Sequence, residues 1–213
     1  MKLKTNIYIK VLILFIITFA TGVALRQCLS TFTEEALLEI FFKSFLATTF
    51  VFLIYLFSRG KWDLFTPVKW KNKYWILILI LIILFSVNNY FQVLYSENQY
   101  YPEMIKSALG ISIIGYIISS TTEEIIYRGF LQPFINANTI SNFSVISRGN
   151  LFATALFFLT HLGFFTVMDP VFAVLSLVNV IIYSLIAGYL FDRTKNIFVL
   201  IVLHIFLVHD KNL

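Results

Sequence analysis

The sequence predicts an all-α fold, a polytopic membrane helix bundle with about seven transmembrane helices. Of the 213 residues, 59% are hydrophobic and only 13% are charged, whereas a soluble domain has roughly 25% charged residues. Apolar residues recur in stretches close to the roughly 20 residues that a helix needs to cross a bilayer. Phe alone occurs 24 times, which is more than a small soluble core needs. We therefore expect one compact bundle over residues 1–213, surrounded by the lipid of the cell membrane.

Seven apolar segments are expected to cross the membrane. The first follows several lysines and resembles a signal peptide, but an uncleaved helix is favoured because the downstream chain is also membrane-like. The fourth segment is long, its second half is polar, and it should end before Pro133. The seventh is short. By residue number the segments are 7–25, 40–58, 74–95, 104–132, 150–168, 171–191 and 196–209.

Basic residues set the expected orientation, because cytoplasmic loops of membrane proteins are enriched in Lys and Arg. The loop after the second segment has five basic residues and one acid, Asp63. We expect this loop and the N-terminus on the cytoplasmic side, and the glutamate-bearing loops after the first and third segments outside. The basic residues of the loop are Arg59, Lys61, Lys69, Lys71 and Lys73.

Composition and motifs argue against several other classes of protein. The net charge of +5 fits a positive-inside membrane protein, and no basic face backs a soluble domain, so nucleic acid is not an expected partner. Cys28 is the single cysteine, so an intramolecular disulfide is impossible. Neither a Gly-x-Ser-Gly serine motif nor a Gly-x-Gly-Asp aspartyl motif is present, which argues against those two intramembrane protease classes.

Ionisable residues inside the apolar segments are the candidate functional residues, because charge within a bilayer is costly. The fourth segment contains Glu123 and Glu124, the fifth contains His161, and the seventh contains His204. With a helical rise of about 1.5 Å per residue, Glu123, His161 and His204 lie roughly 14, 16 and 12 Å from the predicted cytoplasmic ends of their helices. These similar depths predict that the three side chains converge on one site.

Spacing separates the roles of the two glutamates. Glu124 and Arg128 are four residues apart, so they can pair on one face of a helix. Glu123 points about 100° away, which makes it the better candidate for a free general base. An ion-pair cluster near the cytoplasmic surface is the alternative interpretation. Interhelical hydrogen bonds are the favoured role of three buried amides, Asn88, Asn89 and Asn179.

Three motifs in this order resemble the CPBP family of type II CAAX prenyl endopeptidases and bacteriocin-processing or immunity-like relatives. The first is EEIIYR at residues 123–128, followed by Gly129 and Phe130. The second is FFLTH at residues 157–161, and the third begins at His204. The resemblance covers residues 104–209, the expected family core, while the first three segments are compatible with it.

The resemblance implies an intramembrane endopeptidase, of metallo or glutamate type, that cuts a peptide or protein substrate near the cytoplasmic side. Glu123 together with His161 would activate a water molecule, and His204 would help to stabilise the oxyanion. Zinc is a cofactor that the sequence leaves open, with His161, His204 and Glu123 as its ligands, although no His-Glu-x-x-His motif is present. Supporting roles are implied for Glu124, Arg128 and Phe157.

One position departs from the family pattern. The family places Asn or Asp four residues after the final His, and this chain has Val208 there. Loss of an oxyanion donor can cost about 10²–10³ in rate, so a catalytically impaired scaffold or a bacteriocin-immunity protein is the alternative function. A small transporter with a Glu/His proton relay is a third hypothesis. The sequence shows neither an internal repeat nor a pair of Gly/Pro-broken helices that would favour it.

Overall fold

The computed structural model describes residues 5–30, 35–95, 109–139 and 145–209. Every regular element in these ranges is a helix, which confirms the predicted all-α fold. The elements are α1 (Thr5–Leu29), α2 (Glu35–Ser58), α3 (Asn72–Tyr95), α5 (Leu109–Glu124), η1 (Ile125–Leu131), α6 (Gln132–Asn138), α7 (Arg148–Thr160), α8 (Phe164–Val167), α9 (Pro170–Thr194) and α10 (Ile197–His209).

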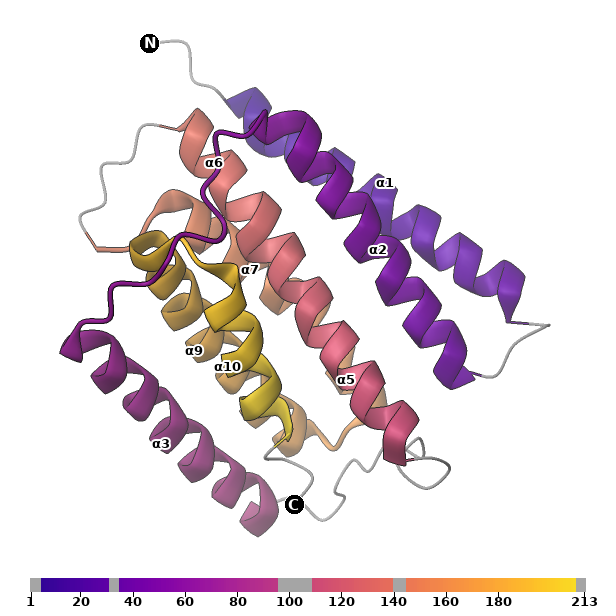
Figure 1. The fold of residues 1–213 in the computed structure, drawn as a ribbon. Coiled ribbons are helices and arrows are strands. Elements are labelled where there is room, and N and C mark those ends of the chain that lie inside the picture. The colour runs from indigo at the N-terminus through magenta and orange to yellow at the C-terminus, as the bar shows by residue number, and fades with distance from the viewer. Residues whose placement is uncertain (1–4, 31–34, 96–108, 140–144, 210–213) are drawn as a thin grey trace.

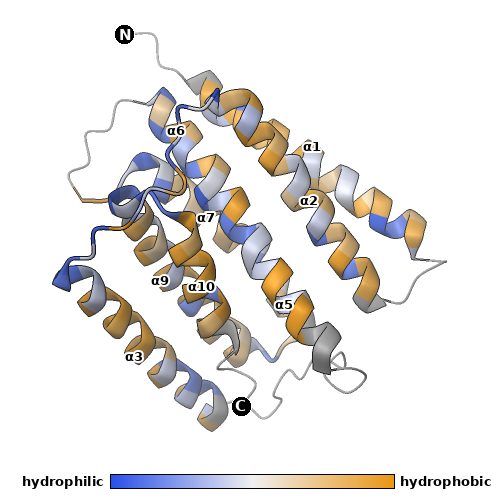
Figure 2. Cartoon of the chain, in the orientation of Figure 1, coloured by the Kyte–Doolittle hydropathy of each residue, from blue (hydrophilic) through white to orange (hydrophobic). Residues whose placement is uncertain are grey.

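Apolar length identifies the chain as a multi-pass membrane protein. Among the described residues, five stretches are long and apolar enough to cross a membrane, and α10 contains a shorter apolar one. Figure 2 shows orange along much of α2, α3 and α9, while blue collects around the loop between α2 and α3. The five stretches are Ile7–Leu29, Leu37–Ser58, Asn72–Gln92, Arg148–Thr166 and Pro170–Thr194.

Successive crossings run in alternating directions, so one end of the bundle gathers the loops expected on the same membrane face (Figure 1). The loop between α2 and α3 is tied there to the junction of α9 and α10. Thr66 donates its amide to the Lys195 carbonyl at 3.0 Å, and Ile197 donates to the Leu64 carbonyl at 2.8 Å. The junction of α9 and α10 also has basic residues, Arg193 and Lys195, so its place at the same end as the basic loop agrees with the charge pattern. The face to which this end belongs stays a prediction.

The prediction that the fourth helix stops before Pro133 was wrong. After α5 the chain forms a π-helix, η1, in which the amide of Gln132 donates to the carbonyl of Tyr127 five residues earlier, the spacing of a π-helix. The helix then continues as α6, with Pro133 in its first turn. Proline has no amide hydrogen to donate to the preceding turn, and Pro133 directly follows the π-helix, where the regular bonds between residues four apart are already interrupted.

The fifth span is not one continuous helix, contrary to prediction. α7 ends at Thr160, and His161 is its C-cap residue. The carbonyl of Phe157 accepts the hydroxyl of Thr160 at 2.9 Å and contacts ring Nδ1 of His161 at 2.7 Å. The His161 amide donates to Phe158 only three residues back. The side chains of Thr160 and His161 thus occupy a carbonyl that a longer helix would use, and α7 ends at this point.

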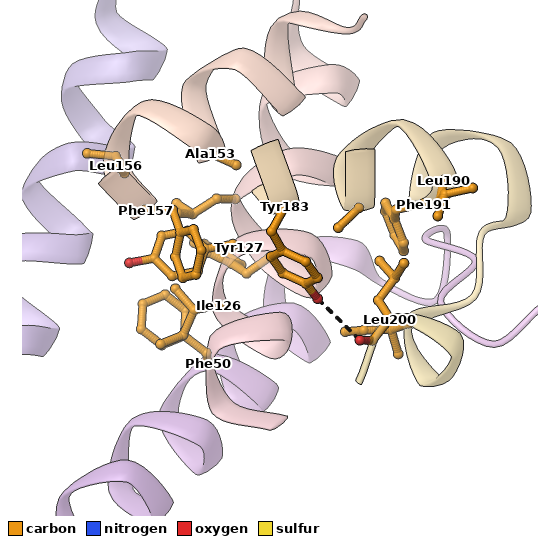
Figure 3. Close-up of a cluster of buried hydrophobic side chains, with 14 of the residues drawn as sticks. Phe50, Ile126, Tyr127, Ala153, Leu156, Phe157, Tyr183, Leu190, Phe191 and Leu200 are labelled. Atoms are coloured by element: carbon orange, nitrogen blue, oxygen red, sulfur yellow. Dashed lines mark hydrogen bonds between the residues drawn. The ribbon is translucent and has the colours of Figure 1, made fainter. Parts of the chain in front are cut away.

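Aromatic side chains from α2, η1, α7 and α9 fill the centre of the bundle (Figure 3). The rings of Tyr127 and Phe157 meet edge to face, with centroids 4.8 Å apart. The Tyr183 hydroxyl oxygen lies 3.2 Å from the Leu200 carbonyl oxygen, so α9 and α10 are in contact there. This packing fixes the helices that bear the candidate residues.

Close contact between α7 and α9 depends on a glycine. A Cβ added at Gly188 would overlap the side-chain amide of Asn150. That amide donates to the Leu185 carbonyl at 3.0 Å, so it cannot move without losing a bond between the helices. The small residue therefore sets the separation of α7 and α9.

Some expected features lie outside the described residues. They include the start of the fourth span at 104–108 and the charges predicted outside the membrane between residues 96 and 108. The main chain of Val208 lies in α10, but its side chain is also outside the described part, so its effect on the site stays a prediction. Two of the N-terminal lysines, Lys2 and Lys4, also lie outside the described residues.

Candidate active site

A pocket of about 310 Å³ lies among α3, α5, α7, α8, α9 and α10. Glu123 from α5, His161 from the end of α7 and His204 from α10 all line it. The structure thus brings the three predicted residues together, as their similar depths indicated, although their catalytic roles stay predictions. The remaining wall is mainly aromatic and aliphatic, with four small polar residues, Ser119, Ser120, Ser176 and Asn179.

The carboxylate of Glu123 faces the pocket but is not free, which corrects the expectation for this residue. Its Oε1 accepts the Ser119 hydroxyl at 3.1 Å and lies 3.5 Å from Nζ of Lys43 on α2. Its Oε2 lies 3.6 Å from Nε2 of His204. The carboxylate is therefore held by groups from three helices, and one of these groups is a cation.

Sequence reasoning missed Lys43. It is the only basic residue in α2, and it stands inside an apolar span, the same signal that singled out Glu123. Lys43 also lies 3.9 Å from Glu39, one turn earlier. A contact 80 positions along the chain, between Lys43 and Glu123, cannot be read from spacing within one helix.

The predicted pairing of Glu124 with Arg128 is confirmed. Nη1 of Arg128 lies 3.4 Å from Oε1 of Glu124, and both side chains are 0% exposed. The same oxygen accepts the Tyr183 hydroxyl at 2.8 Å. Nη2 of Arg128 donates to the Ser184 hydroxyl at 2.9 Å and to the Ser184 carbonyl at 3.1 Å. These bonds offset part of the desolvation of a buried ion pair, so Glu124 anchors the wall behind the pocket.

His204 connects the two glutamates. Its Nδ1 lies 3.0 Å from Oε1 of Glu124, and its Nε2 faces Oε2 of Glu123. An ionised carboxylate only accepts hydrogen bonds, so Nδ1 donates to Glu124. The ring packs against Tyr183 with centroids 4.5 Å apart. Buried groups therefore fix the ring and leave Nε2 on the side of Glu123 and the pocket.

The tautomer of His161 follows from its contact with Phe157. A carbonyl oxygen only accepts, so Nδ1 donates its proton to the Phe157 carbonyl at 2.7 Å. In the neutral ring the other nitrogen, Nε2, then has a free lone pair. Phe157 and Phe164 hold the ring edge to face, at centroid distances of 4.4 and 5.1 Å. Phe157 thus orients the imidazole of His161 at the pocket.

The zinc ligand set does not form as arranged. Within the described ranges, no three His, Cys, Asp or Glu side chains are placed so that they could hold a metal ion. The carboxylate of Glu123 is already in contact with Ser119 and Lys43. Zinc binding by His161, His204 and Glu123 stays a prediction.

The three asparagines join α3 to α9, as predicted. Asn88 donates to the Leu175 carbonyl at 2.8 Å, and Nδ2 of Asn179 donates to Oδ1 of Asn89 at 3.4 Å. Asn179 also lines the pocket. The interhelical role is thus confirmed, and Asn179 has a second side facing the cavity.

Comparison with known proteins supports the motif-based interpretation. The family model described as Type II CAAX prenyl endopeptidase Rce1-like matches residues 105–208. Residues 105–208 are therefore similar to this family, and we call them the Rce1-like segment. This confirms the family resemblance, because the match contains both motifs and His204. No curated protein and no solved structure is significantly similar to the chain.

The Rce1-like segment supplies most of the site. Glu123, His161 and His204 lie within it, and the match supports an intramembrane protease as the kind of function. The N-terminal helices add Lys43 beside Glu123 and Phe85 in the pocket wall. The Rce1-like segment therefore does not build the site alone.

Proposed function

We propose that this protein is an intramembrane endopeptidase that hydrolyses a peptide bond near the cytoplasmic side of the cell membrane. The observation that supports it most is the meeting of Glu123, His161 and His204 at one pocket, in a segment that matches an endopeptidase family. In this proposal the N-terminus is cytoplasmic, and the basic loop between α2 and α3 marks the cytoplasmic end of the bundle.

A water molecule is the nucleophile in the proposed reaction. Glu123 acts as general base, and the lone pair of His161 Nε2 helps to position the water in the pocket. As the water gives its proton to Glu123, its oxygen bonds to the carbonyl carbon of the peptide. The C–N bond then breaks, and the proton passes to the leaving amine. The products are a new carboxyl terminus and a new amino terminus.

His204 supplies a donor for the oxyanion of the intermediate. With both ring nitrogens protonated, Nδ1 donates to Glu124 and Nε2 donates on the pocket side. Donors that are already oriented need no reorganisation as charge develops, which is a large catalytic effect. Glu124, Arg128 and Tyr183 serve this step indirectly, because they hold the imidazole in place.

The substrate in this proposal is a peptide or protein segment that reaches the pocket from the membrane. Aromatic and aliphatic side chains dominate the wall, including Phe164, Phe172 and Val180. Such a wall accepts apolar side chains, while the polar groups at the centre act on the main chain. A processed peptide or leader fits this description.

A comparison of peptide termini in membrane fractions of the native host tests the proposal. Wild type and Glu123→Ala are expressed at matched levels, and a terminus that disappears in the variant identifies both proteolysis and the substrate. Asp63→Ala is the control, because Asp63 is an exposed acid in the loop between α2 and α3 and does not line the pocket. Identical termini, with folded and abundant protein, would favour the scaffold or bacteriocin-immunity function.

A further inference from the structure

Two buried polar residues of α9 line the pocket without a part in the proposed hydrolysis. Ser176 and Asn179 are 1% and 2% exposed, and both contribute to the pocket wall. They are three residues apart, so they lie on the same face of the helix. Together they form a short polar strip beside the candidate active site.

Helix α3 holds each of the two side chains through an amide. Nε2 of Gln92 donates to the Ser176 hydroxyl oxygen at 2.9 Å, and Nδ2 of Asn179 donates to Oδ1 of Asn89 at 3.4 Å. Because Gln92 uses an acceptor lone pair of Ser176, the O–H of this serine is left to donate. Because Asn179 directs its nitrogen to Asn89, its oxygen is left to accept. The strip therefore presents a donor and an acceptor.

The side-chain oxygen of Asn179 is buried and, among the described residues, has no hydrogen-bond partner. Within the described residues, four buried side-chain atoms have no hydrogen-bond partner, and Asn179 is the one of their residues that lines the pocket. A buried polar atom without a partner is costly, and a ligand that donates to it recovers that cost. The other three atoms are Glu124 Oε2, Arg128 Nε and Gln132 Oε1.

We propose that Ser176 and Asn179 dock the main chain of a peptide in the pocket, with the serine donating to a carbonyl and the asparagine accepting from an N–H. This assignment rests on the proposed function for the nature of the ligand, a peptide. A peptide unit offers one acceptor and one donor, which complements the strip. Both side chains are uncharged, so they suit a neutral amide.

An amide and an ester of equal shape test the role of the asparagine. N-benzylacetamide and benzyl acetate differ in one position, where the N–H of the amide is replaced by oxygen. The full chain in lipid nanodiscs is titrated with each probe by ligand-observed NMR, and the signal from empty nanodiscs is subtracted. All variants carry Glu123→Gln so that neither probe is hydrolysed. We expect the amide to bind about fivefold more tightly than the ester, the effect of one net hydrogen bond.

Two variants and one control decide the outcome. Asn179→Leu should reduce the amide-to-ester ratio to about one, whereas Ser176→Ala should weaken both probes because both retain a carbonyl. Asn88→Leu is the control, since Asn88 also joins α3 to α9 but does not line the pocket, and it should keep the ratio. A ratio near one before substitution, or one that survives Asn179→Leu, overturns the proposal. A preference for the ester also overturns it.

The same titration stays decisive if Asn179→Leu fails to fold. Ser176→Ala must then weaken both probes relative to Asn88→Leu, and unchanged binding overturns the proposal. Hydrolysis plays no part in this measurement. A chain with the amide preference but unchanged peptide termini binds peptides without cutting them. A chain that cuts but shows no preference is a peptidase without this docking strip.

Discussion

The ammonium of Lys43 on α2 lies 3.5 Å from the carboxylate of Glu123 on α5. Lys43 also lies 3.9 Å from Glu39, which in turn lies 3.6 Å from Arg26 at the end of α1. A line of alternating charges thus runs from α1 through α2 to the proposed general base. The helices before the Rce1-like segment therefore take part in positioning the site.

Replacing Lys43 by methionine should slow cleavage about tenfold or more with little loss of protein. Hydrogen bonds to charged groups contribute roughly 1.5–3 kcal/mol, and about 1.4 kcal/mol corresponds to a factor of ten in rate. Initial rates in nanodiscs, at equal protein concentration, measure the effect. Lys43→Arg should retain most of the activity, because it keeps a cation beside Glu123. An unchanged rate in Lys43→Met would show that the contact does not position the base.

Removing Arg128 should destabilise the fold rather than change the chemistry alone. Arg128→Met leaves the carboxylate of Glu124 buried without its cation, which typically costs about 3–5 kcal/mol. Thermal unfolding in micelles measures the loss. Glu124→Gln in the same chain should recover part of it, because the uncompensated charge is gone and paired residues are not additive. Additive losses in the double variant would contradict the buried pair.

Gly188→Ala should separate α7 from α9 and lower the midpoint of thermal unfolding. The new methyl group would overlap the amide of Asn150, and overpacking of a tight contact costs about 1–3 kcal/mol. Gly115→Ala is the matched control in α5, where an added Cβ meets nothing within 4 Å. It should be neutral or stabilising, since alanine favours a helix over glycine. Equal midpoints for both variants would contradict the close approach.

The single cysteine offers a direct test of orientation. Cys28 is exposed near the end of α1, and a cytoplasmic N-terminus puts that end outside the cell. A membrane-impermeant maleimide should therefore label Cys28 in intact cells. Lys61→Cys in a Cys28→Ser background should react only after permeabilisation, because Lys61 lies in the loop predicted to be cytoplasmic. The reverse pattern would invert the proposed topology.

Hydrophobic patterning was sufficient to predict the all-α membrane fold and the approximate spans. It did not predict the π-helix before Pro133 or the helix end at His161. One extra residue per turn explains the first, and a side-chain hydrogen bond explains the second. A window of average hydropathy does not resolve such local competition. Pro133 is accommodated in the turn that follows the π-helix. The ring of His161 donates to the Phe157 carbonyl, which a continuous helix would have bonded to the amide of His161.

Spacing within one helix predicted the pair of Glu124 and Arg128, because both residues belong to the same helix. The contacts of Glu123 with Lys43 and of Glu124 with Tyr183 join residues 80 and 59 positions apart. Such contacts depend on how helices pack, which periodicity does not determine. The unpaired side-chain oxygen of Asn179 could not be predicted either, because it results from the bond between the Asn179 amide nitrogen and Asn89 on α3.

The π-helix η1 makes the site sensitive to the length of the chain as well as to its chemistry. The wider turns of η1 hold more residues than an α-helix of the same height, so the number of residues between 125 and 131 helps to direct Glu123 into the cavity. A deletion in the regular turns of α5 has no such turn to absorb it and would rotate the residues on its two sides by about 100°.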